Sequence, residues 1–231
     1  MANLIGIAGP SGFGKSTSIF KSEELKISGL DPKETGIINV TGKPLPVKGA
    51  NKLYPLDKKI TDGGNHVITE DPEKVSKIID YISNNRTDIK NLIIDDAGYL
   101  MGLEAINKSK VKGFDKWVDL AVNFMKVVNS ARNARYDLNI IFIFHTEIKD
   151  NITKIKTAGA MIDNTIFLDG LFTTILYSEL EPSPTGESVT YKFRTHSDGV
   201  STCKTPAGMF KEDLIPNDMG YVLKKMNEYY N

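Results

Sequence analysis

The sequence predicts an α/β fold, with a mostly parallel central sheet flanked by helices and antiparallel strands added in the C-terminal third. Three short apolar runs, at residues 3–8, 91–95 and 139–144, have the length and composition of buried strands. Segments with helical character separate them, and strands that alternate with helices form parallel sheets. After residue 160 the pattern changes to short alternating stretches between turn residues, which is typical of hairpins.

Four further elements are expected around the first two apolar runs. The segment at residues 15–27 is expected to be a helix. Residues 37–40 and 66–69 are expected strands, because each is a short run rich in β-branched residues with Pro and Gly in the loops around it. A helix is expected over residues 73–84, since Asp71 is a good N-cap and a proline follows it in the first turn.

The second half of the chain is expected to begin with a long helix at residues 114–135, whose apolar residues form one stripe: Trp117, Leu120, Ala121, Phe124, Val127, Val128 and Ala131. A helix at residues 217–230, capped by Asn217 or Asp218, is expected to close the chain. Between them, hairpins with turns at 182–186 and 197–199 are expected from the apolar or alternating stretches 163–169, 171–180, 188–196 and 199–204.

Length and composition indicate a chain with a substantial core. The 231 residues are 40% hydrophobic and 25% charged, which is ordinary for a folded domain and excludes disorder. The 29 Lys and Arg residues balance 29 Asp and Glu residues, so a nucleic acid would have to bind a local basic patch. The single cysteine, Cys203, excludes an internal disulfide framework and a Cys-based zinc site, and fits a reducing compartment.

Neither a membrane span nor a signal peptide is expected. No segment reaches the roughly 18 consecutive apolar residues that a membrane helix needs. The N-terminus lacks a basic region and leads directly into the strand at residues 3–8. The sequence therefore predicts a cytoplasmic protein without a membrane partner.

A glycine-rich motif follows the first expected strand. Residues 9–17 match the pattern G-x-x-x-x-G-K-[ST] and comprise Gly9, Pro10, Ser11, Gly12, Phe13, Gly14, Lys15, Ser16 and Thr17. In this pattern the glycines let backbone N–H groups surround the β-phosphate, Lys15 reaches the β- and γ-phosphates, and Ser16 ligates Mg²⁺. Because the motif stands between an expected strand and an expected helix, it predicts a site for a nucleoside triphosphate with Mg²⁺.

Carboxylates at strand ends supply candidates for the rest of this site. Asp95 ends the strand at 91–95, where ligands of parallel α/β sheets bind, and is the expected Mg²⁺ ligand. Asp96 either orients the attacking water or caps the next segment. Glu70 and Asp71 are rival candidates for the catalytic carboxylate, and Glu70 is the better one because Asp71 resembles a helix cap.

His145 follows the strand at 139–144 and is a candidate sensor of the γ-phosphate. A polar side chain at this strand end could lie within hydrogen-bond reach of the phosphate. The alternative is a core histidine satisfied by the backbone, since five apolar residues precede it.

The order of these motifs resembles that of the RecA-like core P-loop ATPases encoded by bacteriophages, a group that includes phage single-strand annealing and recombination proteins. The resemblance extends over nearly the whole chain and includes Ile93-Ile94-Asp95-Asp96, Phe142-Ile143-Phe144-His145-Thr146-Glu147 and Lys204-Thr205-Pro206-Ala207-Gly208-Met209-Phe210. It implies a single RecA-like ATPase domain over residues 1–231. Residues 1–160 would form the nucleotide-binding core, and residues 161–231 the C-terminal hairpins and closing helix. A phage-encoded protein would act in the host cytoplasm.

The resemblance also implies a homo-oligomer, a ring or a filament, with ATP between subunits. A basic residue of the adjacent subunit would then contact the γ-phosphate, and Lys204 and Arg194 are the candidates. The expected turn at 197–199 would place them on neighbouring strands of one hairpin. The alternative is that both are ordinary solvated strand residues.

RecA-like proteins hold DNA with two loops, which correspond here to residues 101–113 and 147–160. Across residues 104–135, seven basic residues stand against three acidic ones, as phosphate-backbone binding requires. Neither loop has an aromatic residue for base stacking, so backbone contact is the expected mode. The alternative is a solvated surface. The candidate DNA-binding residues are Lys108, Lys110 and Lys112 in the first loop, and Lys149, Lys154 and Lys156 in the second.

Two functions therefore remain open from the sequence. The first is a Mg²⁺-dependent, oligomeric ATPase that binds single-stranded DNA in recombination or replication, with a single-strand-binding protein as a further candidate partner. The second is an ATP-gated assembly protein that binds a protein partner and no DNA; the neutral net charge favours it. A nucleoside or small-molecule kinase is weaker, because the chain after His145 lacks an Arg-rich lid.

Overall fold

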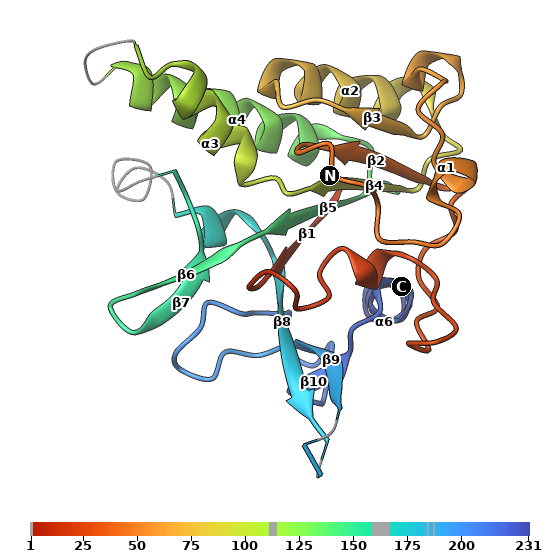
Figure 1. The fold of residues 1–231 in the computed structure, drawn as a ribbon, viewed down its shortest axis with the longest axis vertical. Helices are drawn as coiled ribbons and strands as arrows, with labels where there is room; N and C mark the ends of the chain where they lie inside the picture. Colours follow the sequence, from red (N-terminus) through yellow and green to blue (C-terminus); the bar gives the residue numbers. More distant parts are fainter. Residues whose placement is uncertain (1, 111–114, 159–166, 184, 187) are drawn as a thin grey trace.

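The computed structural model describes residues 2–110, 115–158, 167–183, 185–186 and 188–231. Its central sheet contains eight strands: β1 (Asn3–Ala8), β2 (Thr35–Asn39), β3 (His66–Ile68), β4 (Asn91–Asp95), β5 (Asn139–Phe144), β8 (Thr174–Pro182), β9 (Val189–Arg194) and β10 (Leu214–Pro216). They lie in the order β10-β9-β8-β1-β5-β4-β2-β3 (Figure 1). From β8 to β3 all neighbours are parallel, whereas β9 and β10 are added antiparallel. The expected fold class is confirmed.

Helices cover both faces of this sheet (Figure 1). One apolar cluster joins the sheet to α2 (Pro72–Asn85), α3 (Tyr99–Asn107) and α4 (Asp115–Asn133). A second cluster, on the opposite face, joins it to α6 (Met219–Tyr230) and the short 3-10 helix η1 (Thr17–Ile19). The helices α2, α4 and α6 confirm those expected at residues 73–84, 114–135 and 217–230, whereas α3 was not expected. The shorter elements are α1 (Ala50–Leu53), η2 (Ile60–Asp62) and η3 (Leu168–Leu171). None of the helices in the described parts of the chain has the length and apolar character needed to cross a membrane.

The prediction of a helix over residues 15–27 is wrong. Only η1 is helical there, and Ser22 and Ile27 then pair through their backbones across a tight turn. The cause is tertiary, because the backbone N–H of Gly29 donates to the carboxylate of Asp218 at 3.0 Å, which draws the segment toward α6. Gly29 has a φ of 62°, in the left-handed region that favours glycine.

The two stretches expected to be loops contain regular structure. The first stretch, 101–113, contains most of α3, which ends at Asn107, and its residues 111–113 lie outside the described residues. The second, 147–160, contains most of a hairpin of β6 (Thr146–Lys149) and β7 (Ile152–Ile155), while its residues 159–160 are not described. The two residues between these strands have φ values of 52° and 62°, as in a tight hairpin turn. A two-stranded hairpin therefore follows the end of β5.

The C-terminal third differs from expectation in one strand. The stretches 171–180 and 188–196 correspond to β8 and β9, but residues 199–204 form no strand, and β10 is the outer neighbour of β9. Lys204 instead makes an isolated bridge to Ile175 of β8, so Lys204 and Arg194 do not share a hairpin. The side chain of Asp198 accepts hydrogen bonds from the two residues 200 and 201, which holds this part as a turn. Most of the stretch 163–169 lies outside the described residues.

Asp218 ties the start of α6 to the segment after η1. Its carboxylate caps the helix by accepting from the N–H of Gly220 at 2.9 Å. It also accepts from the N–H and the hydroxyl of Ser28, each at 2.7 Å, and from the N–H of Gly29. The Asp218 side chain is buried, whereas Ser28 is exposed, so the carboxylate reaches from the interior to the segment after η1 and joins it to α6.

We expect Asp218→Ala to lower the free energy of unfolding by about 3 kcal/mol, because it removes the buried carboxylate that accepts four hydrogen bonds and caps α6. Asp71→Ala is the matched control, since Asp71 caps α2 by accepting from two exposed N–H groups, and its loss should cost about 1 kcal/mol. Urea denaturation of both variants measures the difference. Equal losses would contradict the role assigned to Asp218.

Candidate nucleotide-binding site

The glycine-rich loop leaves β1 and turns back over the end of the sheet. Gly12 and Gly14 have φ values of 83° and 80°, which explains why glycine stands at both positions. A Cβ atom at Gly9 would lie 3.1 Å from the Cβ of Ser178 on β8, so this glycine lets the loop pass close to the neighbouring strand. The loop therefore follows a curved path whose backbone conformations and close approach to β8 favour glycine at these three positions.

Lys15 lies inside this loop. Its ammonium group donates to the carbonyl oxygen of Pro10 at 2.7 Å, and the residue is 6% exposed. Burial lowers the pKa of Lys15 to about 8, against the raising influence of Asp96 and Asp95. Burial disfavours the charged ammonium of Lys15. A phosphate group bound in the loop would stabilise that charge and offset the effect of burial.

Ser16 and Asp95 come together although β5 lies between β4, which ends at Asp95, and β1, which precedes the loop of Ser16. The hydroxyl of Ser16 donates to the Asp95 carboxylate at 2.8 Å. Burial raises the pKa of Asp95, and the hydrogen bond from Ser16 opposes this. A hydroxyl and a carboxylate oxygen beside a phosphate loop are the hard oxygen ligands that Mg²⁺ prefers. These two residues fit a magnesium ion.

Asp96 is held by a network of polar side chains. Its carboxylate accepts from the Thr41 hydroxyl at 3.0 Å and from the Lys43 ammonium at 2.8 Å, and the Nε2 atom of His145 lies 3.3 Å away. Burial raises the pKa of Asp96, but these three neighbours outweigh it and hold the pKa well below the usual range. The residue has a φ of 61°, an uncommon value that fixes where the carboxylate points.

His145 stands at the end of β5, directly beside Asp96. Its ring packs edge-on against Tyr99 at the start of α3, with 5.8 Å between ring centres. The side chain therefore faces the carboxylate rather than the apolar core between sheet and helices. The structure places His145, Asp96 and the glycine-rich loop at the same edge of the sheet.

Sequence reasoning missed Lys43. This lysine follows β2, pairs with Asp96, and lies over the ring of Tyr99 at 5.5 Å from its centre. The ion pair raises the pKa of Lys43. Together with Ser11 and His145 it lines a pocket of about 850 Å³. Lys43 could have been predicted from its position shortly after β2, a strand that pairs with β4. The same kind of strand-end position identified Asp95.

Glu70 is not part of this group. It follows β3, the edge strand, and β2 lies between β3 and β4. Its side chain is exposed and accepts a hydrogen bond from Asn107 at the end of α3. The order of the strands therefore separates Glu70 from Asp95. Asp71 caps α2 as expected.

The C-terminal third forms the back of the glycine-rich loop. A Cβ atom at Gly14 would lie 2.8 Å from the ring of Tyr191 on β9 and 3.1 Å from the side-chain oxygen of Asn217. Asn217 is buried, and both polar atoms of its amide lack a hydrogen-bond partner among the described residues. The loop is therefore supported by residues about 200 positions away in the sequence.

The candidate intersubunit residues differ in their environment. Arg194 forms a fork with the Glu179 carboxylate and lies 3.7 Å from Asp198, so its charge is already paired within the chain. The side chain of Lys204 is half-buried and has no ion pair in the part of the chain that the structure describes. Of the two, Lys204 has the freer charge.

The candidate DNA-binding lysines are likewise unequal. Lys108 pairs with Glu104 at 2.9 Å and with Asp119 at 3.4 Å. Lys154 lies 3.5 Å from Glu147, and Lys149 also has an interaction partner. Lys110 and Lys156 are exposed, as is Lys149, and Lys156 lines the pocket beside His145. Lys112 lies outside the described residues.

A curved glycine-rich loop, a buried lysine and a Ser–Asp pair on a parallel α/β sheet define the class of P-loop nucleoside triphosphatases. The chain belongs to the AAA domain family, which matches over residues 1–200. No curated protein matches the chain. Among 202 similar chains of solved structures is a KaiC-like protein, PH0186, of the hyperthermophilic archaeon Pyrococcus horikoshii OT3. It is 14% identical, with a TM-score of 0.42, over 83% of this chain and 77% of that chain.

Proposed function

We propose that this protein binds ATP with Mg²⁺ and hydrolyses it to ADP and phosphate. The observation that carries the proposal is the contact of 2.8 Å between the Ser16 hydroxyl and the Asp95 carboxylate, beside the buried Lys15. Lys15 would bind the β- and γ-phosphates, and Ser16 and Asp95 would hold the ion directly or through water. When bound, Mg²⁺ would neutralise charge that develops on the phosphate oxygens.

Asp96 is the group proposed to position the attacking water. Its carboxylate is ionised, and its contacts with Lys43 and Thr41 prevent it from rotating away. A carboxylate in a fixed orientation can accept a hydrogen bond from water and align the water with the γ-phosphate. His145, 3.3 Å from Asp96, would donate to the same group or to the γ-phosphate.

We expect phosphate release from ATP to require Mg²⁺ and to fall by about 10-fold or more in Ser16→Ala, since the variant removes one oxygen ligand of the ion. Release measured with excess Mg²⁺ and with a chelator tests this. Ser188→Ala, an exposed position after β8, is the control and should match the unaltered protein. Mg²⁺-independent release, or full activity of Ser16→Ala, would argue against the proposal.

A second proposed function is ATP-dependent binding of single-stranded DNA by an oligomer, a ring or a filament. Its support is a shared pocket: Gly102 of α3 and Lys156 after β7 line the same pocket as Ser11 of the phosphate loop. A change at the γ-phosphate could thus alter both segments that were expected to contact DNA. The resemblance to phage recombination ATPases points to recombination or replication. In the same proposal, a single-strand-binding protein is a further partner, and Lys204 contacts the γ-phosphate that the adjacent subunit binds.

The rival function is ATP-gated assembly with a protein partner and no DNA.

If the protein binds single-stranded DNA, we expect a fluorescent oligonucleotide to bind more tightly when a non-hydrolysable ATP analogue is present. Lys156→Ala should lower the slope of log affinity against log salt by about 0.7, the contribution of one phosphate contact. Lys108→Ala is the matched control, because Lys108 is already paired with Glu104 and Asp119. No binding at low salt, with or without the analogue, would favour the assembly protein.

A further inference from the structure

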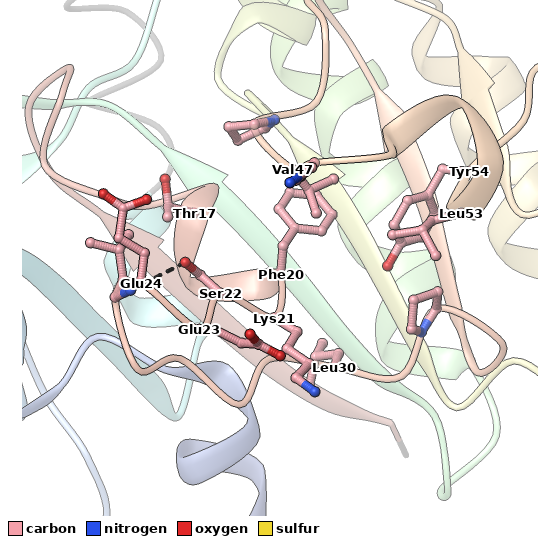
Figure 2. Close-up of a pocket in the computed structure, with 14 residues that line it drawn as sticks. Thr17, Phe20, Lys21, Ser22, Glu23, Glu24, Leu30, Val47, Leu53 and Tyr54 are labelled. Carbon is pink, nitrogen blue, oxygen red and sulfur yellow. Dashed lines mark hydrogen bonds between the residues drawn. The ribbon is translucent and has the colours of Figure 1, made fainter.

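A second large pocket begins where the phosphate loop ends. Its volume is about 720 Å³, and Thr17, the last residue of the glycine-rich motif, forms one side of it (Figure 2). The remaining walls come from the segment after η1 and from the chain between β2 and β3. The two pockets share no lining residue, so this one is separate from the pocket beside His145.

The inner walls of this pocket are apolar and aromatic. Phe20 and Tyr54 are buried and meet edge to face, with 5.6 Å between ring centres and an angle of 71° between the rings. Leu30 and Val47 complete this surface (Figure 2). Rigid aromatic and aliphatic walls of this kind favour a flat, weakly polar ligand, since they offer packing and little compensation for a lost hydration shell.

One buried polar atom interrupts the apolar surface. The Tyr54 hydroxyl has no hydrogen-bond partner among the described residues, although the side chain is 2% exposed. Burial raises the pKa of Tyr54, so the hydroxyl stays neutral and can both donate and accept. In Figure 2 this oxygen points toward Leu30. A buried hydroxyl without a partner is costly, and a ligand atom within reach would remove that cost.

The mouth of the pocket carries balanced charge. Glu23 and Glu24 stand beside Lys21, and Lys48 stands on the opposite loop. Two carboxylates and two ammonium groups give no excess positive charge, so the pocket is a poor site for a phosphate group. Carboxylates are, however, good acceptors for the hydroxyl groups of a sugar.

We propose that this pocket takes the nucleoside end of the bound nucleotide, with the base against the apolar wall that Phe20 and Tyr54 help to form and the ribose near the carboxylates of the mouth. The inference rests on the proposed function, because the phosphates must occupy the glycine-rich loop for the base to reach past Thr17. It extends that function by assigning base recognition to the segment after η1, whose path is set by Asp218.

The test compares ATP with inorganic tripolyphosphate, which has the phosphates without the nucleoside. In the full chain, Leu53→Trp places a larger side chain at the pocket wall, at a residue that is 38% exposed and so tolerant of change. We expect ATP affinity, measured by calorimetry, to fall about 10-fold or more, as for a lost apolar site, with tripolyphosphate affinity unchanged. Leu56→Trp, at an exposed residue of the same segment that does not line the pocket, should bind both as the unaltered protein does.

A second variant removes only the buried hydroxyl. Tyr54→Phe should keep or raise the melting temperature, because an unpaired buried polar atom is lost, while ATP affinity falls about 5-fold, as for one hydrogen bond. Unchanged ATP affinity in both variants, or an equal loss for ATP and tripolyphosphate, would overturn the assignment of the pocket. If the unaltered protein bound neither ligand, the phosphate site itself would be wrong.

Discussion

Lys15→Ala is expected to lower ATP affinity by about 100-fold, which corresponds to ~3 kcal/mol for a charged hydrogen bond in a buried site. The reason is the position of the ammonium group, which is held in the curve of the loop by the Pro10 carbonyl at 2.7 Å. The fold should not suffer, because the substitution also removes a buried charge. Calorimetric titration with ATP measures the change.

The pH dependence of binding provides an independent check on Lys15. Burial lowers its pKa to about 8, so the free protein loses this charge as pH rises through that value. Bound phosphate favours the charged form, and ATP binding above pH 8 therefore takes up a proton. Affinity should weaken about tenfold per pH unit in that range, the limit for one linked proton.

The alanine variant should lose this pH dependence. Lys33→Ala, an exposed lysine away from the loop, serves as the matched control and should keep both the affinity and its pH dependence. ATP affinity that survives in Lys15→Ala would overturn the assignment of the phosphate loop.

Asp96→Asn is expected to slow ATP turnover by a factor of about 100, the cost of a misplaced attacking water. ATP affinity should change little, since Lys15, Ser16 and Asp95 are retained. Asparagine is the suitable replacement because it tolerates the φ of 61° that this position requires. Phosphate release under saturating ATP, together with calorimetric affinity, separates the two effects.

The matched control for this variant is Asp62→Asn, an exposed carboxylate in η2 that should leave turnover unchanged. If Asp96→Asn lowered affinity and turnover together, Asp96 would be a structural anchor for Lys43 and Thr41 instead of a group that acts on water. Full turnover in Asp96→Asn would exclude it from the reaction altogether.

Local sequence patterns were sufficient for the elements that are buried on both faces. β1, β4 and β5 are short apolar runs, and their length and the turn residues around them favour strands that are covered on both faces. The glycine-rich motif specifies its own backbone, because Gly12 and Gly14 occupy left-handed conformations. Asp95 follows from the rule that parallel strands present ligands at their carboxyl ends.

Local patterns failed where distant contacts decide the backbone. Residues 15–27 have enough helix-forming side chains to suggest a helix, yet Asp218 captures the N–H groups of Ser28 and Gly29 and a turn forms instead. Glu70 was a reasonable candidate until the sheet order placed β2 between its strand and β4. Strand order depends on contacts that no single segment encodes.

By itself, the sequence determined the class of fold, the glycine-rich loop and the place of Asp95 at a strand end, because each follows from the pattern of a strand and the turn after it. Only the tertiary structure decided which side chains surround Asp96. It brought Lys43 from the end of β2 and His145 from the end of β5, and it left Glu70 at the edge. The physical reason is that electrostatic contacts act over a few ångströms of space, whatever the separation along the chain.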